Sequence, residues 1–178
     1  MARAWMAAAA ACVVASAGCG GGGDPAPPGV VTPDGTYLAT AVRCAGVAAP
    51  SPLADLITGG RSFTLQVAGG AGNMSWSDGL CTIRERIALT YPATGHLTAA
   101  PVGFFACSPG RAACASLSGA TFGGDVCGTS DLSGPKDYLF APSTVSVGQT
   151  IQLTRQGGGE CASSGASDPL SLTLTRQP

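Results

Sequence analysis

The chain has 178 residues, with nine basic and ten acidic side chains and a formal charge of −1, and its basic residues are scattered. A nucleic-acid-binding surface needs a basic patch or stripe, so we expect no nucleic-acid partner. One histidine, and cysteines without C-x-x-C spacing, argue against a zinc site. The glycine run 69–72 precedes a predicted strand rather than a helix, so we expect neither a phosphate loop nor a cofactor.

The first 18 residues have the pattern of a secretion signal. Arg3 gives a basic start, and the alanine-rich run 4–15 is too short to span a bilayer, which takes about 20 apolar residues. Ser16-Ala17-Gly18-Cys19 then resembles the lipobox of bacterial lipoproteins, although Ser16 stands where that motif usually has leucine. The resemblance implies a signal peptide over 1–18 and a lipid on Cys19, which would anchor the protein to a membrane.

A competing cleavage site is Ala15-Ser16-Ala17, an A-x-A sequence that would leave Cys19 without lipid. Cysteine parity favours the lipobox. Cys12 is removed with the signal in both cases, and lipidation of Cys19 leaves six cysteines, which can pair fully. Gly20, in place of the aspartate that retains some lipoproteins at the inner membrane, indicates the outer membrane of a bacterial envelope, on its periplasmic or surface face.

A glycine- and proline-rich tether is predicted over 19–33, and a single β domain over 34–178. The domain is dominated by period-two alternation of apolar and polar residues, and long helical periodicity is absent. We expect strands at 36–44, 61–67, 81–91, 97–107, 138–140, 151–156 and 172–177, a short strand and turn over 74–79, a helical turn within 51–57 and a loop over 108–134. In the first strand, Leu38, Thr40, Val42 and Cys44 are expected on one face.

The clearest unit is the hairpin 81–107, in which Tyr91 pairs with Leu97 if the turn has ordinary length. This register places Cys81 opposite Cys107, and opposed residues have β-carbons about 4.5–5.5 Å apart. It therefore predicts a Cys81–Cys107 disulfide. Elimination then pairs Cys114 with Cys127.

The two last strands, 151–156 and 172–177, resemble each other in sequence and are joined by a loop that contains Cys161. If the last strand pairs antiparallel with the first, Cys161 lies beside Cys44, which predicts a Cys44–Cys161 disulfide. Seven or eight short strands predict an all-β fold, either a single antiparallel up-and-down barrel or a sandwich. Gly35-Thr36-Tyr37 and the run of hairpins resemble lipocalin-like and other calycin barrels, in topology and one short motif.

Glu85 is a carboxylate on the otherwise apolar face of its strand. Inside a barrel it could contact a polar group of a ligand, and burial would raise its pKa. The alternative, which we favour, is that Glu85 pairs with an inward arginine or lies where the sheet opens to water. Arg155, which continues the face of Ile151 and Leu153, is the expected partner. Glu85 and Arg155 are the candidate ligand contacts.

No catalytic constellation is evident. His96 lies in a predicted hairpin loop without a G-x-S-x-G elbow, and Asp125, Asp131 and Asp137 match no calcium-loop spacing. We expect a non-enzymatic monomer, a lipid-anchored module that binds a small apolar ligand or an envelope protein. The alternatives are a structural surface lipoprotein without a specific ligand, and a hydrolase in which Glu85 acts with a second carboxylate about 5–10 Å away.

Overall fold

The computed structural model describes residues 29–178, so the predicted signal 1–18, Cys19 and the first part of the tether lie outside the described residues. This part of the chain contains strands, two α-helices and one 3-10 helix. In chain order they are β1 (Gly35–Cys44), β2 (Val47–Ala48), η1 (Ala54–Leu56), β3 (Ser62–Ala68), β4 (Ala71–Ser77), β5 (Thr82–Thr90), β6 (His96–Pro101), β7 (Ala106–Ser108), α1 (Arg111–Phe122), β8 (Lys136–Ala141), β9 (Thr150–Gln156), α2 (Glu160–Ser163) and β10 (Leu170–Arg176).

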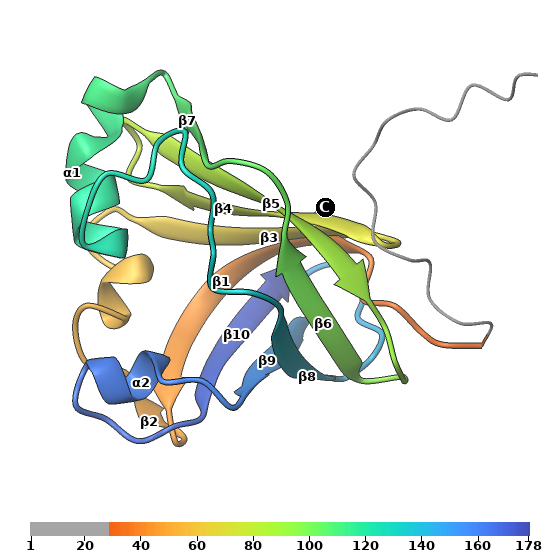
Figure 1. Cartoon of the computed structure of the whole chain (residues 1–178). Coiled ribbons are helices and arrows are strands. Elements are labelled where there is room, and N and C mark those ends of the chain that lie inside the picture. The colour runs from red at the N-terminus through yellow and green to blue at the C-terminus, as the bar shows by residue number, and fades with distance from the viewer. Residues whose placement is uncertain (1–28) are drawn as a thin grey trace, which may run out of the picture.

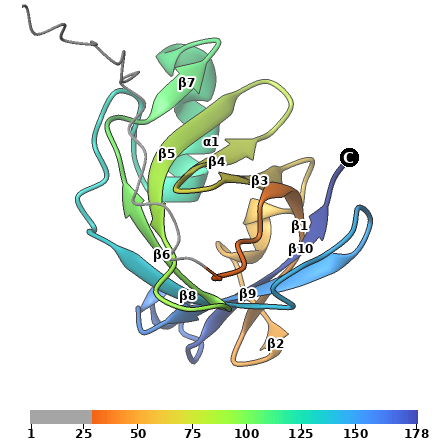
Figure 2. The ribbon, with the colours of Figure 1, turned by 90° about the vertical axis from the view of Figure 1, so that its right-hand side faces the viewer.

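Eight of these strands form a closed antiparallel barrel, seen along its axis in Figure 2. Neighbours around the ring follow the order β1, β3, β4, β5, β6, β8, β9 and β10, and β10 pairs with β1 to complete it. The short strands β2 and β7 add to β1 and β5. A closed ring removes the unpaired edges that an open sheet exposes. The predicted up-and-down barrel is confirmed, and the sandwich alternative is excluded.

The alternation read from the sequence places the core inside the ring. On β3, Phe63, Leu65 and Val67 are buried, and the residues between them are more exposed. On β5, the inward face runs from Ile83 through Glu85 to Leu89, as predicted. Because successive side chains of a strand point to opposite faces, one apolar stripe per strand suffices to fill the barrel.

The first strand departs from its predicted facing. The register of β1 against β10 shifts between Ala39 and Ala41, which is a β-bulge. Tyr37 and Ala39 are buried before the bulge, and the inward face resumes at Val42 after it. The predicted inward positions of Leu38 and Thr40 are therefore wrong, because one extra residue moves the following side chains to the other face.

The prediction of a loop over 108–134 is wrong for the first half of this segment, which forms α1. Its alanines favour a helix, and its buried residues Cys114, Leu117 and Ser118 have helical spacing. Gly123, at φ +75°, ends the helix in the left-handed conformation that glycine adopts without strain. No helix within residues 29–178 has the length and hydropathy needed to cross a membrane.

The two ends of the barrel differ. Figure 1 shows α1 and α2 at one end and the start of β1 at the other. At the end where β1 starts, the side chains of Tyr37, Tyr91 and Phe140 are buried. The rings of Tyr91 and Phe140 meet edge to face, with their centroids 6.5 Å apart. Large side chains thus close that end, called here the closed end, whereas the helical end holds the cavity described below.

The chain enters the barrel at the closed end. Val30 packs against the core, and the backbone N–H of Val31 donates to Thr94 Oγ1 at 3.3 Å. The carboxylate of Asp34 accepts a hydrogen bond from the N–H of Gly69 at 3.1 Å. The last residues of the predicted tether are therefore fixed to the barrel rather than free of its core.

Three disulfides staple the helical end. Cys44, at the end of β1, is bonded to Cys161 in α2, the pairing that barrel closure predicts. The others join Cys81 to Cys114 and Cys107 to Cys127. Disulfides persist in oxidising compartments, so three of them indicate an extracytoplasmic protein.

The predicted Cys81–Cys107 pair is wrong because the hairpin register changes within it. β5 and β6 pair as predicted, with Leu89 opposite Ala99. The chain leaves this register after Pro101, and β7 pairs with β5 so that Cys107 lies opposite Ile83 instead of Cys81.

The predicted Cys114–Cys127 pair is also wrong, because both cysteines have other partners. α1 carries Cys114 to Cys81, and backbone hydrogen bonds of Phe105 with residues 128 and 129 bring Cys127 beside Cys107.

Candidate functional site: a cavity in the helical end of the barrel

A cavity of about 500 Å³ lies inside the barrel at its helical end. Small-molecule sites measure about 300–1,000 Å³ and are mostly apolar with a few placed polar groups. Strands around the ring supply the lining, together with η1, the end of α1 and the loop before β8. Leu132, on that loop, is 91% exposed, so the cavity opens to solvent there.

Four aromatic side chains form one wall of the cavity, called here the aromatic wall: Phe63, Trp76, Phe105 and Phe122. The ring centroid of Trp76 lies 5.5 Å from that of Phe63, 6.3 Å from that of Phe105 and 5.0 Å from that of Phe122. Such tilted and edge-to-face contacts are favourable aromatic geometries. The sequence gives no sign of this wall, because its residues come from four separate segments: β3, β4, the loop before β7 and α1.

Glu85 projects into this cavity from β5 and is only 5% exposed. Its Oε1 atom has no hydrogen-bond partner among the described residues. Burial raises the pKa of Glu85 to about 7, with the carboxylate of Asp131 acting in the same direction and Lys136 against it. A carboxyl group that changes charge near neutral pH is therefore held at the cavity wall.

Asp131 and Lys136, at the cavity opening, form an ion pair with a 3.1 Å separation between Oδ2 and Nζ. The N–H of Ser133 also donates to Asp131 Oδ1 at 2.8 Å. Burial acts to raise the pKa of Asp131, but the hydrogen bonds from Ser133 and Lys136 outweigh it and lower the pKa to about 2. Asp131 is thus a fixed anion whose charge Lys136 balances.

The predicted ion pair between Glu85 and Arg155 is not formed. Arg155 Nε bonds instead to Glu160 Oε1 of α2 at 3.3 Å. Its Nη1 donates to the backbone oxygens of Asp137 and Gln156, at 3.2 and 2.9 Å. Position on the strand explains the difference, since Arg155 lies near the end of β9, where α2 covers the barrel. Glu160, not Arg155, lines the cavity.

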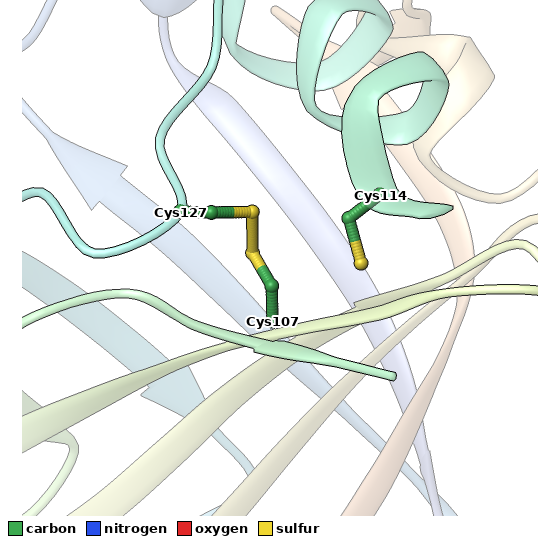
Figure 3. A group of neighbouring side chains, drawn as sticks. All are labelled: Cys107, Cys114 and Cys127. Carbon is green, nitrogen blue, oxygen red and sulfur yellow. A yellow bond between two sulfur atoms is a disulfide. The ribbon is translucent and has the colours of Figure 1, made fainter. Parts of the chain in front are cut away.

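The remaining sequence candidates fall outside this site. His96 is exposed at the start of β6, and Asp125 pairs with Arg111 on the surface, with Nε and Oδ2 3.3 Å apart. The sulfurs of Cys107, Cys114 and Cys127 lie within 4.8 Å of one another. Figure 3 shows Cys114 beside the Cys107–Cys127 disulfide. Each sulfur is bonded in a disulfide, and a metal ligand would need a free thiolate, so this cluster is structural.

Comparisons with known proteins identify no relative. No family model matches the chain, and neither the curated proteins nor the solved structures give a match. The cavity and the charges around it are therefore the features from which a function is inferred.

Proposed function

We propose that this protein is a lipid-anchored envelope protein that binds a small, largely apolar ligand in the barrel cavity. The observation that carries the proposal is the cavity of about 500 Å³ itself, with its aromatic wall and its opening to solvent. An eight-stranded barrel is just wide enough either to be filled by its own side chains or to hold one small ligand. A purely structural barrel would gain stability by filling this space.

The ligand would be held mainly by burial of apolar surface, at about 25 cal/mol per Å². The aromatic wall provides broad contacts, and Leu65, Leu97 and Leu172 complete an apolar lining on other strands. Preformed walls reduce the ordering cost of binding. The described residues thus supply the main contributions that a small-ligand site requires.

The position of the tether fits this role. Residues 29–34 join the barrel at its closed end, and the cavity opens at the opposite, helical end. A lipid on Cys19 would therefore hold the closed end toward the membrane and turn the opening away from it, where a ligand can enter from the aqueous phase. The three disulfides suit the oxidising compartment that this location implies.

A dye-binding experiment tests the cavity. The full chain should bind the neutral apolar dye N-phenylnaphthylamine saturably, with enhanced dye fluorescence. Ala99 is buried and lines the cavity, whereas its neighbour Ala100 does not. We expect Ala99→Phe to weaken dye binding at least about tenfold by occupying the space, and the matched control Ala100→Phe to leave it unchanged. Equal dye binding by both variants would contradict binding in the cavity.

The anchor has a separate test. Cells that express the full chain with a radiolabelled fatty acid should label the protein, and Cys19→Ser should abolish the label and release the protein from membranes. Cys12→Ser is the control, because Cys12 lies within the predicted signal. An unlabelled wild-type protein would contradict lipid anchoring and would leave the binding proposal standing.

A hydrolase is the second candidate, because Glu85 and Asp131 line one cavity with pKa values of about 7 and about 2. Carboxyl groups with separated pKa values can divide the roles of acid and anion. The ion pair of Asp131 with Lys136 and the apolar lining favour binding over hydrolysis. Turnover of nitrophenyl glycosides that is lost in both Glu85→Gln and Asp131→Asn would reverse this ranking.

A further inference from the structure

We infer that the ligand is a cationic amphiphile, whose ammonium head group pairs with Glu85 and whose apolar body packs against the aromatic wall. The inference rests on the proposed binding function of the same cavity and specifies the chemistry of its ligand. Its basis is the distribution of charged groups around the cavity and the position of Glu85 within it.

Four charged side chains line the cavity, and three of them have ion-pair partners. Asp131 pairs with Lys136, and Glu160 pairs with Arg155. Glu85 forms no ion pair within residues 29–178, although it is more buried than these others. A ligand that binds here therefore meets two ion pairs and one carboxyl group without an ion-pair partner. Glu160 Oε2 is also buried without a hydrogen-bond partner, but its carboxylate is already paired with Arg155.

The hydrogen-bonding capacity of Glu85 is only partly used: a side-chain hydrogen bond with Asp131 contributes to its raised pKa, but one carboxyl oxygen has no partner. Its Oε1 is buried without a donor, an arrangement that folded proteins generally avoid. An ammonium group carries three N–H donors and a positive charge, so it would satisfy this atom with a charge-assisted hydrogen bond. A carboxylate ligand would be disfavoured at Glu85, since it would place a second anion beside a buried carboxyl group.

The neighbours of Glu85 suit such a head group. Glu85 lies directly opposite Met74, and Trp76 is the next inward residue of β4. Opposed and diagonal side chains on one face of a sheet are within reach of each other. A cation held at Glu85 would thus lie near Trp76, whose indole attracts cations at its face. The other titratable groups at this point are Asp131, Lys136 and Tyr138.

The carboxyl group of Glu85 can provide the needed charge. Its pKa of about 7 leaves it largely ionised at about pH 8, and a bound cation would stabilise the ionised form further. Alkylamines are protonated at that pH, so both partners carry their charges.

Three probes with the same alkyl chain test the head-group preference: decylamine, decanol and decanoate. Trp5 and Trp76 are the only tryptophans of the chain, and Trp5 lies within the predicted signal 1–18, so Trp76 fluorescence of the processed protein is a direct report from the cavity wall. At about pH 8 we expect decylamine to bind at least about tenfold more tightly than decanoate, with decanol between them.

Glu85→Gln should remove most of the decylamine preference and leave decanol binding unchanged. Asp137→Asn is the matched control, because it removes one carboxylate from the exposed outer face of β8. It should keep the preference. Titration with decylamine should also raise the thermal midpoint of the wild-type chain by more than that of Glu85→Gln.

The outcomes separate the two proposals. If decanoate or decanol binds as tightly as decylamine, or if Glu85→Gln keeps the preference, the head-group inference is overturned and cavity binding stands. If none of the three probes changes Trp76 fluorescence and the dye does not bind either, the binding function itself is overturned.

Discussion

Met74 and Glu85 face each other across β4 and β5, with both side chains lining the cavity. This pair places a carboxyl group against a thioether and an aromatic wall, at a position where apolar side chains would pack without a desolvation cost. Such a group weakens the fold when it is charged. The charged carboxyl group of Glu85 therefore costs stability, and its proposed role is to bind a ligand.

Glu85→Gln should stabilise the fold at high pH. Since the folded-state pKa of Glu85 is raised from 4.5 to about 7, the folded protein binds more protons than the unfolded chain between these values. Stability therefore falls as pH rises through this window. The variant should be more stable than the wild type by on the order of 2–3 kcal/mol at about pH 8, and by much less at about pH 4.

Urea unfolding of both proteins at the two pH values measures this difference. Asp131 and Lys136 face the same carboxyl group but are present in both proteins, so their titration cancels in the comparison. A stability difference that is the same at both pH values would contradict a raised pKa at Glu85.

Gly72→Ala should destabilise the barrel. A Cβ atom at this buried position of β4 would lie 2.7 Å from the backbone oxygen of Gln66 and 3.1 Å from side-chain atoms of Ile87 and Leu89. Overpacking of this kind typically costs about 1–3 kcal/mol. Thermal unfolding checks the loss. In the control Gly119→Ala, a new Cβ on α1 meets nothing within 4 Å, and the fold should gain about 1 kcal/mol. The prediction fails if Gly72→Ala matches the wild type.

The Cys44–Cys161 disulfide should contribute more to stability than Cys107–Cys127, because it closes a longer loop. The sequence separations are 117 and 20 residues. In the chain-entropy model these loops correspond to about 5 and about 3 kcal/mol. Double alanine variants of each pair, compared by urea unfolding, give the two values. The reverse order would show that effects other than loop closure dominate.

Peptide mapping of the oxidised protein should recover Cys81–Cys114 and Cys107–Cys127. The test is demanding, because sulfurs of both bridges lie within 4.8 Å of one another and other pairings would need only small movements. Recovery of a Cys81–Cys107 peptide would contradict the observed register of β7.

The barrel was predictable because the alternation of apolar and polar residues directly indicates strands with one buried face. The inward faces of β3 and β5 and the β5–β6 register follow from period-two patterns and one hairpin turn. The closure of β10 onto β1, on which the Cys44–Cys161 prediction depended, is also observed. The bulge in β1 was not, since one extra residue between Ala39 and Ala41 leaves the composition of the strand unchanged. The predictions of Cys81–Cys107 and Cys114–Cys127 were wrong for a similar reason, a register change after Pro101, whereas Cys44–Cys161 was predicted correctly.

The site was predictable only in part. Glu85 was identifiable as a charge on an apolar face, and the structure places it in the cavity. Its surroundings were not, because Asp131 and Glu160 come from a loop and a short helix that no periodicity places at the barrel interior. Trp76 lay in a recognisable alternating stretch, but its contacts with Phe105 and Phe122 depend on α1. That helix was not predicted, because its sequence is rich in small residues and shows no clear apolar stripe.

The most direct test of cavity binding compares the native and denatured masses of the protein as isolated from its own cells. We predict a native species that is heavier by one small molecule, which denaturation releases. Ala99→Phe should lose this extra mass, and Ala100→Phe should keep it. Equal native and denatured masses in the wild type, together with no added mass after incubation with decylamine or N-phenylnaphthylamine, would contradict the proposal that the barrel is a ligand-binding module.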